Sequence, residues 1–110
     1  MLSDEMRYRM LKLLEANPGM SQREVARELA ISLGRVNYCM QALIRKGWLK
    51  ASQFRNSRNK VAYLYLLTPR GLEAKASLTV SFLKIKLREY EMLREEIAQI
   101  RREAEGYDRH

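Results

Sequence analysis

One segment of this chain gathers side chains of the types that pair with the edges of nucleic-acid bases. Arg35, Asn37, Tyr38 and Gln41 fall on the face of a predicted helix opposite its apolar residues. Arginine forms bidentate hydrogen bonds with guanine, and asparagine or glutamine forms them with adenine. We therefore expect this face to enter a major groove, with residues 32–34 at its tip. The alternative is an ordinary solvated helix face, since exposed helix faces are polar by default.

A second candidate is the polar segment 55–60, which carries three cations and no large apolar side chain. At the tip of a hairpin, Arg58 could enter a narrow minor groove, where the negative potential is strongest. Arg55 and Lys60 would then contact the flanking phosphates. An ordinary solvated loop is again the alternative.

Charge is strongly segregated along the chain. Between Glu28 and Glu73 the sequence has no acidic residue, but it has eight basic ones. Residues 1–71 contain 13 Lys and Arg against 5 Asp and Glu, and residues 72–110 contain 8 against 8. The formal charge of +8 therefore belongs to the first two thirds of the 110 residues. A field of this kind attracts polyanions.

Residues for catalysis or metal binding are scarce. The chain has one His, at position 110, and one Cys, Cys39, and these cannot form a metal cluster or a nucleophile–base pair. A glycine-rich phosphate loop is also missing. We expect no enzymatic activity, no metal and no cofactor. Cys39 lies beside a predicted apolar stripe, which favours a half-buried packing role over a redox sensor, because a sensor thiol needs exposure.

Three predicted helices would position the polar side chains. The first begins after Ser3 and ends at Asn17-Pro18-Gly19. The second begins at Ser21 with a capping box, and the third begins after Ser32 and ends at Gly47. A tight turn between the second and third helices is typical of a helix-turn-helix. The predicted apolar residues are Met6, Met10, Leu13, Leu14, Val25, Ala26, Leu29, Val36, Met40, Leu43 and Ile44.

Two strands and a long helix follow. Residues 48–51 and 61–67 are predicted strands, and residues 52–60 form a hairpin connector. Thr68-Pro69 begins a helix with no internal break before Gly106. Its apolar residues recur mostly at the 4-3 spacing of a coiled coil, with one three-residue slip. This predicted dimerisation seam comprises Leu83, Leu87, Tyr90, Leu93, Ile97 and Ile100.

The predicted fold is thus mainly α with a small β-hairpin (α+β): a winged helix-turn-helix followed by a long C-terminal coiled-coil helix. We expect a DNA-binding domain over residues 1–71 and a dimerisation helix over residues 72–110. The N-terminus lacks the apolar stretch of a signal peptide, and the longest apolar run is too short to cross a bilayer. With its single cysteine, the chain is expected to be soluble and cytoplasmic.

These features resemble one family. Ser21–Glu24, Lys46-Gly47-Trp48-Leu49 and Leu67-Thr68-Pro69-Arg70-Gly71 look like the corresponding anchors of bacterial MarR-type winged-helix transcriptional regulators, and in particular of the small subfamily associated with exopolysaccharide gene clusters. The resemblance covers nearly the whole chain. It implies DNA binding as a homodimer, with the third helix as the recognition helix and Arg58 as the wing arginine.

The chain departs from the family pattern at two positions. Asn56 stands where the wing usually carries an acid, which makes this wing more basic. Ala30 stands where the turn often holds glycine. The chain also starts almost directly with its first helix, so we do not expect the small-molecule effector pocket of larger family members.

The resulting hypothesis is a homodimeric, sequence-specific bacterial transcription regulator that binds a palindromic double-stranded operator. The alternatives are a winged helix that binds nucleic acid without sequence preference, and an adaptor that grips another protein with its long helix. The residues expected to contact DNA are Ser21, Arg23, Ser32, Leu33, Gly34, Arg35, Asn37, Tyr38, Gln41, Arg55, Asn56, Arg58 and Lys60.

Overall fold

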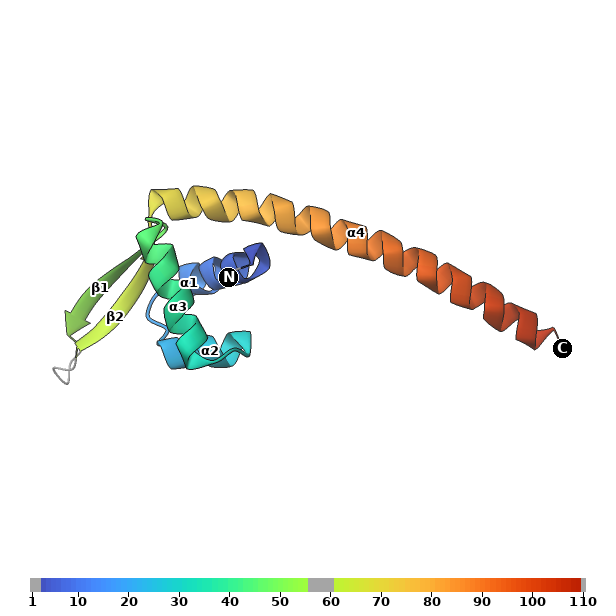
Figure 1. Ribbon diagram of the computed structural model, residues 1–110, viewed down its shortest axis with the longest axis horizontal. Coiled ribbons are helices and arrows are strands. Elements are labelled where there is room, and N and C mark those ends of the chain that lie inside the picture. The colour runs from blue at the N-terminus through green and yellow to red at the C-terminus, as the bar shows by residue number, and fades with distance from the viewer. Residues whose placement is uncertain (1–2, 56–60, 110) are drawn as a thin grey trace. The chain divides into compact units, whose positions relative to one another are not determined.

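The computed structural model describes residues 3–55 and 61–109, and it confirms the winged helix-turn-helix with a long C-terminal helix (Figure 1). The chain divides into two compact units, Met1–Thr79 and Val80–His110. The elements in chain order are α1 (Asp4–Ala16), α2 (Gln22–Leu29), α3 (Leu33–Arg45), β1 (Leu49–Arg55), β2 (Val61–Leu67) and α4 (Pro69–Asp108).

Serine side chains begin each of the first three helices, as the sequence predicts. The hydroxyl oxygens of Ser3, Ser21 and Ser32 accept hydrogen bonds from backbone N–H groups three residues later, at 3.1, 3.2 and 3.1 Å. At Ser21 the capping box is complete, because the Glu24 carboxylate accepts a hydrogen bond from the Ser21 backbone N–H in return. These bonds satisfy backbone donors that a helix start leaves unpaired.

The turn between α2 and α3 depends on a left-handed alanine. Ala30 has φ 55° and ψ 44° and closes α2 through its backbone N–H. Left-handed geometry costs a residue with a Cβ about 1–2 kcal/mol. The turn therefore keeps the geometry that glycine would give and carries the strain of the alanine side chain.

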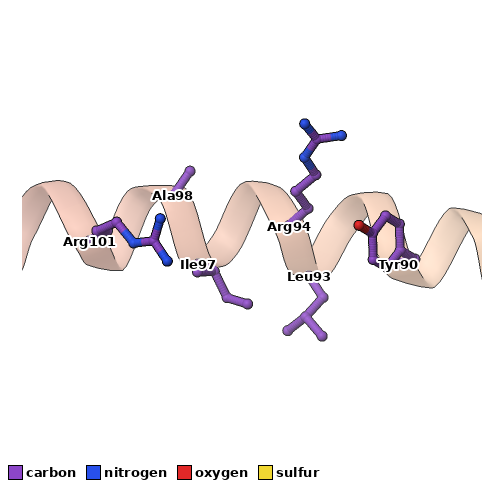
Figure 2. A pocket seen from close by; sticks show the side chains of 6 residues that line it. All are labelled: Tyr90, Leu93, Arg94, Ile97, Ala98 and Arg101. Carbon is purple, nitrogen blue, oxygen red and sulfur yellow. The ribbon is translucent and has the colours of Figure 1, made fainter.

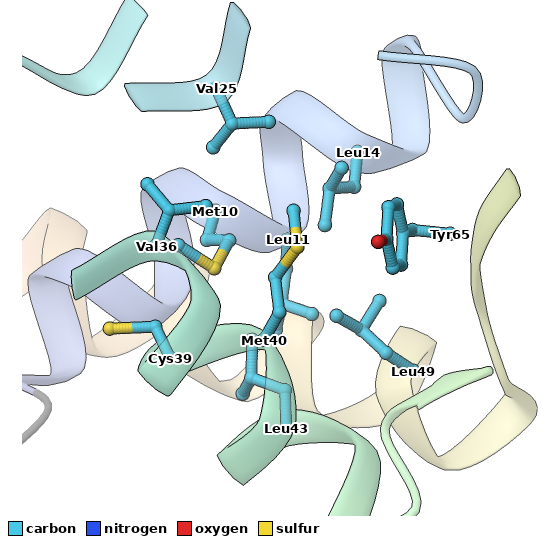
Figure 3. Close-up of a cluster of buried hydrophobic side chains, with 10 residues drawn as sticks. All are labelled: Met10, Leu11, Leu14, Val25, Val36, Cys39, Met40, Leu43, Leu49 and Tyr65. Carbon is cyan, nitrogen blue, oxygen red and sulfur yellow. The ribbon is translucent and has the colours of Figure 1, made fainter. Parts of the chain in front are cut away.

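The core of the first unit lies where α1, α2, α3 and the hairpin meet (Figure 3). Val36, Met40 and Leu43 are fully buried, which confirms the predicted inner stripe of α3. On α1 the prediction missed Leu11, which is fully buried, while Leu13 is only partly buried. The core thus covers a wider arc of α1 than the predicted stripe.

The wing is a two-stranded antiparallel hairpin with β1 paired to β2 from Leu49↔Leu67 to Arg55↔Val61. The predicted range of β2 is confirmed. The predicted range of β1 is wrong, because the strand begins at Leu49 and continues through residues 52–55, which we assigned to the connector. Three of those four residues are polar and give no alternating strand pattern, and the backbone ladder with β2 extends the strand through them.

The junction between α3, the hairpin and α4 explains the spacing of the Gly47 and Thr68–Gly71 anchors. Gly47 has φ 78°, and its carbonyl accepts a hydrogen bond from the Thr68 hydroxyl. Thr68 also donates its backbone N–H to the Trp48 carbonyl at 3.0 Å, and its hydroxyl accepts the Gly71 N–H at 3.0 Å. Gly71 is buried, and a Cβ there would lie 2.1 Å from the Trp48 carbonyl oxygen. Only glycine lets α4 begin this close to the backbone of Trp48.

Helix α4 has 40 residues, has no break before Gly106, and continues through that residue to Asp108. One interior glycine costs a helix only about 1 kcal/mol, and good helix formers precede it. Lys75 of its first turns forms an ion pair with Glu15 of α1 at 3.1 Å. In the described ranges, 3–55 and 61–109, no helix is long and apolar enough to cross a membrane.

Candidate nucleic-acid interface

The polar face of α3, defined by Arg35, Asn37, Tyr38 and Gln41, is exposed along its length. Tyr38 keeps 57% of its surface accessible. The opposite face is anchored in the core by the buried stripe. The helix is therefore held rigidly from behind while four hydrogen-bonding side chains face outward, which is the geometry that recognition of base edges requires.

The N-terminal tip of α3 is open as well. Leu33 is 43% exposed, and a Cβ at Gly34 would meet nothing within 4 Å. The Ser32 hydroxyl uses an acceptor position for its cap and retains its own O–H as a donor. A donor hydroxyl beside the positive end of a helix can contact a phosphate.

Helix α2 presents a similar N-terminus. Ser21 is the helix cap and Arg23 is exposed in the first turn. Both residues are therefore available on the surface, as the predicted contacts require. Glu24 adds a carboxylate to this turn, so its charge partly offsets that of Arg23.

A chain of hydrogen bonds links the polar face to the core and to the wing. The Asn37 amide nitrogen Nδ2 donates to Gln22 Oε1 at 3.3 Å, and Gln22 Nε2 donates to the Tyr65 hydroxyl at 3.1 Å. The sequence analysis did not include Gln22 or Tyr65 in the site. The three residues lie 15 and 43 positions apart, so no local pattern connects them.

On the wing, the structure describes the strands but not the predicted contacts Asn56, Arg58 and Lys60, which lie outside the described residues. Arg55 is exposed and occupies the last described position of β1, opposite Val61. The contacts of the wing residues with DNA stay predictions.

The ion pairs seen among the described residues lie outside the basic span, residues 29–72. The pairs Arg7–Asp4, Arg9–Glu5, Lys75–Glu15 and Lys86–Glu89 all use cations from outside residues 29–72. Within the span, the Lys46 ammonium lies 5.0 Å from the centre of the Trp48 ring, a cation–π contact that preserves its charge.

Cys39 is fully buried rather than half-buried, with 1% of its surface accessible. Burial raises the pKa of its thiol, and the Arg35 guanidinium opposes this rise only in part. A buried thiol with a raised pKa forms little reactive thiolate. Packing is therefore the role that the geometry supports.

Among residues 3–55 and 61–109, no group of three or more His, Cys, Asp or Glu could hold a metal ion.

The second unit, considered by itself, is a helix with exposed apolar side chains. All six residues of the predicted seam are 44–59% accessible. In Figure 2, Leu93 and Ile97 point to one side of α4, while Arg94 and Ala98 point to the other. Leu93 and Ile97 therefore share one side of the helix, as two members of a coiled-coil seam would.

Comparisons with known proteins agree with this architecture. Residues 3–50 match a family model described as winged helix-turn-helix DNA-binding. The structure is similar to the PcaV transcriptional regulator from Streptomyces coelicolor, solved with its natural ligand, with a TM-score of 0.63 and 24% identity over 77% of this chain. It is also similar to a mutant of MepR from S. aureus bound to an oligodeoxyribonucleotide, with a TM-score of 0.57 and 17% identity over 86% of this chain.

At these identities the likeness establishes the fold. The chain spans 59% of the length of the PcaV chain and 74% of the MepR chain. No curated protein sequence matches it significantly.

Proposed function

We propose that this protein is a sequence-specific DNA-binding transcription regulator of the MarR type, of the small exopolysaccharide-associated subfamily, acting as a homodimer. The polar face of α3 is the observation that carries the proposal. It offers an arginine and two amides to solvent from a helix fixed in the core, inside a span without acidic residues. The family model over residues 3–50 and the DNA-bound MepR neighbour support the same assignment.

In the proposed complex, α3 enters the major groove with its N-terminus foremost. Arg35, Asn37 and Gln41 contact base edges, and Tyr38 packs beside them. Ser21, Arg23 and Ser32 contact phosphates on either side, because exposed helix N-termini favour anions. Arg58 enters the adjacent minor groove, and Arg55 and Lys60 contact its backbone.

Dimerisation is proposed to use α4. The leucine and isoleucine side chains along α4 are half-exposed, and contact of apolar surface with water is unfavourable. The same row of side chains on a second copy of the helix would bury them. Flanking glutamates and arginines are mixed and nearly balanced in number, which allows two copies to approach without net repulsion. Two winged helices joined in this way would bind the half-sites of a palindromic operator about one helical turn, or a multiple of it, apart.

The test begins with selection of bound duplexes from a random pool, followed by fluorescence anisotropy on the selected and scrambled sequences. We expect the wild type to prefer the selected duplex by at least about 1,000-fold at physiological salt. Replacing Asn37 or Gln41 by alanine should reduce the preference at one base pair each, by about 1–3 kcal/mol.

Arg58→Ala should weaken binding by more than Lys12→Ala, an exposed residue of α1 that loses the same charge without a proposed DNA contact. Equal affinity of the wild type for selected and scrambled duplexes would instead indicate a non-specific nucleic-acid-binding protein, with affinity set by salt. Absence of duplex binding at moderate salt would favour an adaptor that uses α4.

A further inference from the structure

We infer that Gln22 and Tyr65 are positioning residues that hold Asn37 in an orientation suited to adenine. The inference rests on the proposed function and adds two specificity-determining residues that make no base contact of their own. It starts from the hydrogen bonds Asn37 Nδ2 to Gln22 Oε1 at 3.3 Å and Gln22 Nε2 to the Tyr65 hydroxyl at 3.1 Å.

The direction of this chain decides which groups of Asn37 remain for DNA. An amide nitrogen carries two hydrogens, and Gln22 takes only one of them. The second hydrogen and the carbonyl oxygen Oδ1 remain available together. Adenine requires this donor–acceptor pair, because its major-groove edge offers N7 as an acceptor and the N6 amino group as a donor. An asparagine held by its nitrogen in this way is prepared for adenine.

Tyr65 anchors the series of hydrogen bonds that leads through Gln22 to Asn37. Tyr65 is 8% exposed and belongs to the core, where Figure 3 shows its ring beside Leu14 and Leu49. Its backbone N–H donates to the Pro18 carbonyl oxygen at 3.0 Å, which ties β2 to the loop before α2. Because both the ring and the backbone of Tyr65 are anchored, its hydroxyl is a stable reference point for the partly buried Gln22.

Positioning matters because Asn37 is exposed in the unbound protein. A surface amide samples several rotamers, and ordering it on DNA costs free energy equivalent to about a 3- to 10-fold change in affinity. A side chain that is already oriented avoids most of this cost, but only with the base that fits the orientation. Removing the support should therefore reduce discrimination at one base pair while leaving contacts to phosphates intact.

The test compares two tyrosines of the same strand. Tyr65→Phe deletes the hydroxyl that bonds Gln22, whereas Tyr63→Phe deletes a hydroxyl that bonds Gln53 Nε2 at 3.1 Å. The two rings lie 6.3 Å apart and are stacked, so both variants make the same chemical change in nearly the same place. Only Tyr65 is connected to Asn37.

Binding is measured by anisotropy on the selected duplex and on duplexes with single base-pair changes. We expect Tyr65→Phe and Gln22→Ala to lose about 3- to 10-fold of the preference at the base pair identified by Asn37→Ala. Tyr63→Phe should retain it. In the Asn37→Ala background, Tyr65→Phe should have no further effect at that base pair, because residues that act through one contact are not additive.

Gln22→Glu provides a conservative rescue. A carboxylate still accepts from Asn37 Nδ2, and it can accept from the Tyr65 hydroxyl in place of donating to it. This variant should keep the base preference while it binds all duplexes more weakly, owing to the added negative charge.

Three results would overturn the inference: equal behaviour of Tyr65→Phe and Tyr63→Phe, loss of preference at a different base pair, or loss of the preference in Gln22→Glu. A wild type without any base preference would refute the proposed function itself, and this inference with it. The two failures are therefore distinguishable.

Discussion

Replacement of Gly71 by alanine should destabilise the first unit by about 3 kcal/mol. The added Cβ would lie 2.1 Å from the carbonyl oxygen and 2.9 Å from the carbonyl carbon of Trp48, and both are backbone atoms that no rotamer change can move. Relief requires α4 to shift away from the strand. Such overpacking costs about 1–3 kcal/mol.

The shift would also disrupt the hydrogen bonds that Thr68 makes to the carbonyl groups of Gly47 and Trp48. Each contributes about 0.5–1.5 kcal/mol. The helix gains about 0.5–1 kcal/mol from replacing glycine, which offsets part of the loss. For a unit of this size, a net change of about 3 kcal/mol corresponds to a fall in Tm of roughly 15 °C.

Trp48 is the only tryptophan of the chain, so its fluorescence reports directly on this contact during thermal or urea unfolding. Protein concentration must be held constant, since association shifts apparent stability. Gly34→Ala is the matched control, because an added Cβ there meets nothing within 4 Å, and it should leave stability unchanged or raise it by about 0.5–1 kcal/mol. A Gly71→Ala protein with the Tm of the wild type would refute this account of the junction.

Three further predictions follow from the fold. Ala30→Gly should stabilise the protein by about 0.5–1 kcal/mol in urea unfolding, because it removes left-handed strain at an exposed position; unchanged stability would contradict this. The Cys39 thiol should resist alkylation at neutral pH in the native state but react in urea. A native thiol that reacts as fast as the unfolded one would contradict this prediction. Because folding raises the pKa of the Cys39 thiol, the stability that the protonated thiol contributes is present below about pH 9 and is lost as pH rises. The pair Leu93→Lys and Ile97→Lys should convert the proposed dimer to a monomer in sedimentation, whereas Ala98→Lys, on the other side of α4, should not; a dimer that survives the pair would exclude this seam.

Local signals were sufficient to predict most of the fold from the sequence. The serine caps, Gly47 and Thr68-Pro69 each act within a few residues, so their effect can be recognised without the rest of the chain. Residues 52–55 were assigned incorrectly because their strand structure comes from pairing with β2 and not from their own side chains. Leu11 was missed because burial on α1 depends on how many elements surround it.

In the candidate site, too, some features follow from local sequence and others depend on tertiary contacts. The outward direction of Arg35, Asn37 and Gln41 follows from helical period once Val36 and Met40 are placed inside. The contribution of Gln22 and Tyr65 could not be predicted, because it needs the distance between side chains on three elements. Sequence patterns therefore suffice to propose the groups that contact DNA, whereas the hydrogen bonds from which we infer a positioning role appear only in the tertiary structure.

The helices of the first unit differ in the acidic residues of their first turns. A helix N-terminus is stabilised by acidic side chains, and α1 has Asp4 and Glu5 in its first turn while α2 has Glu24. Helix α3 has none there, and Arg35 occupies the place where an acid would help it most. Folding alone would favour the opposite choice. Helix α4 also lacks an acid in its first turn, but it is held there by the hydrogen bonds of Thr68. Under the proposed function, a phosphate group of DNA would supply the negative charge that the α3 N-terminus favours.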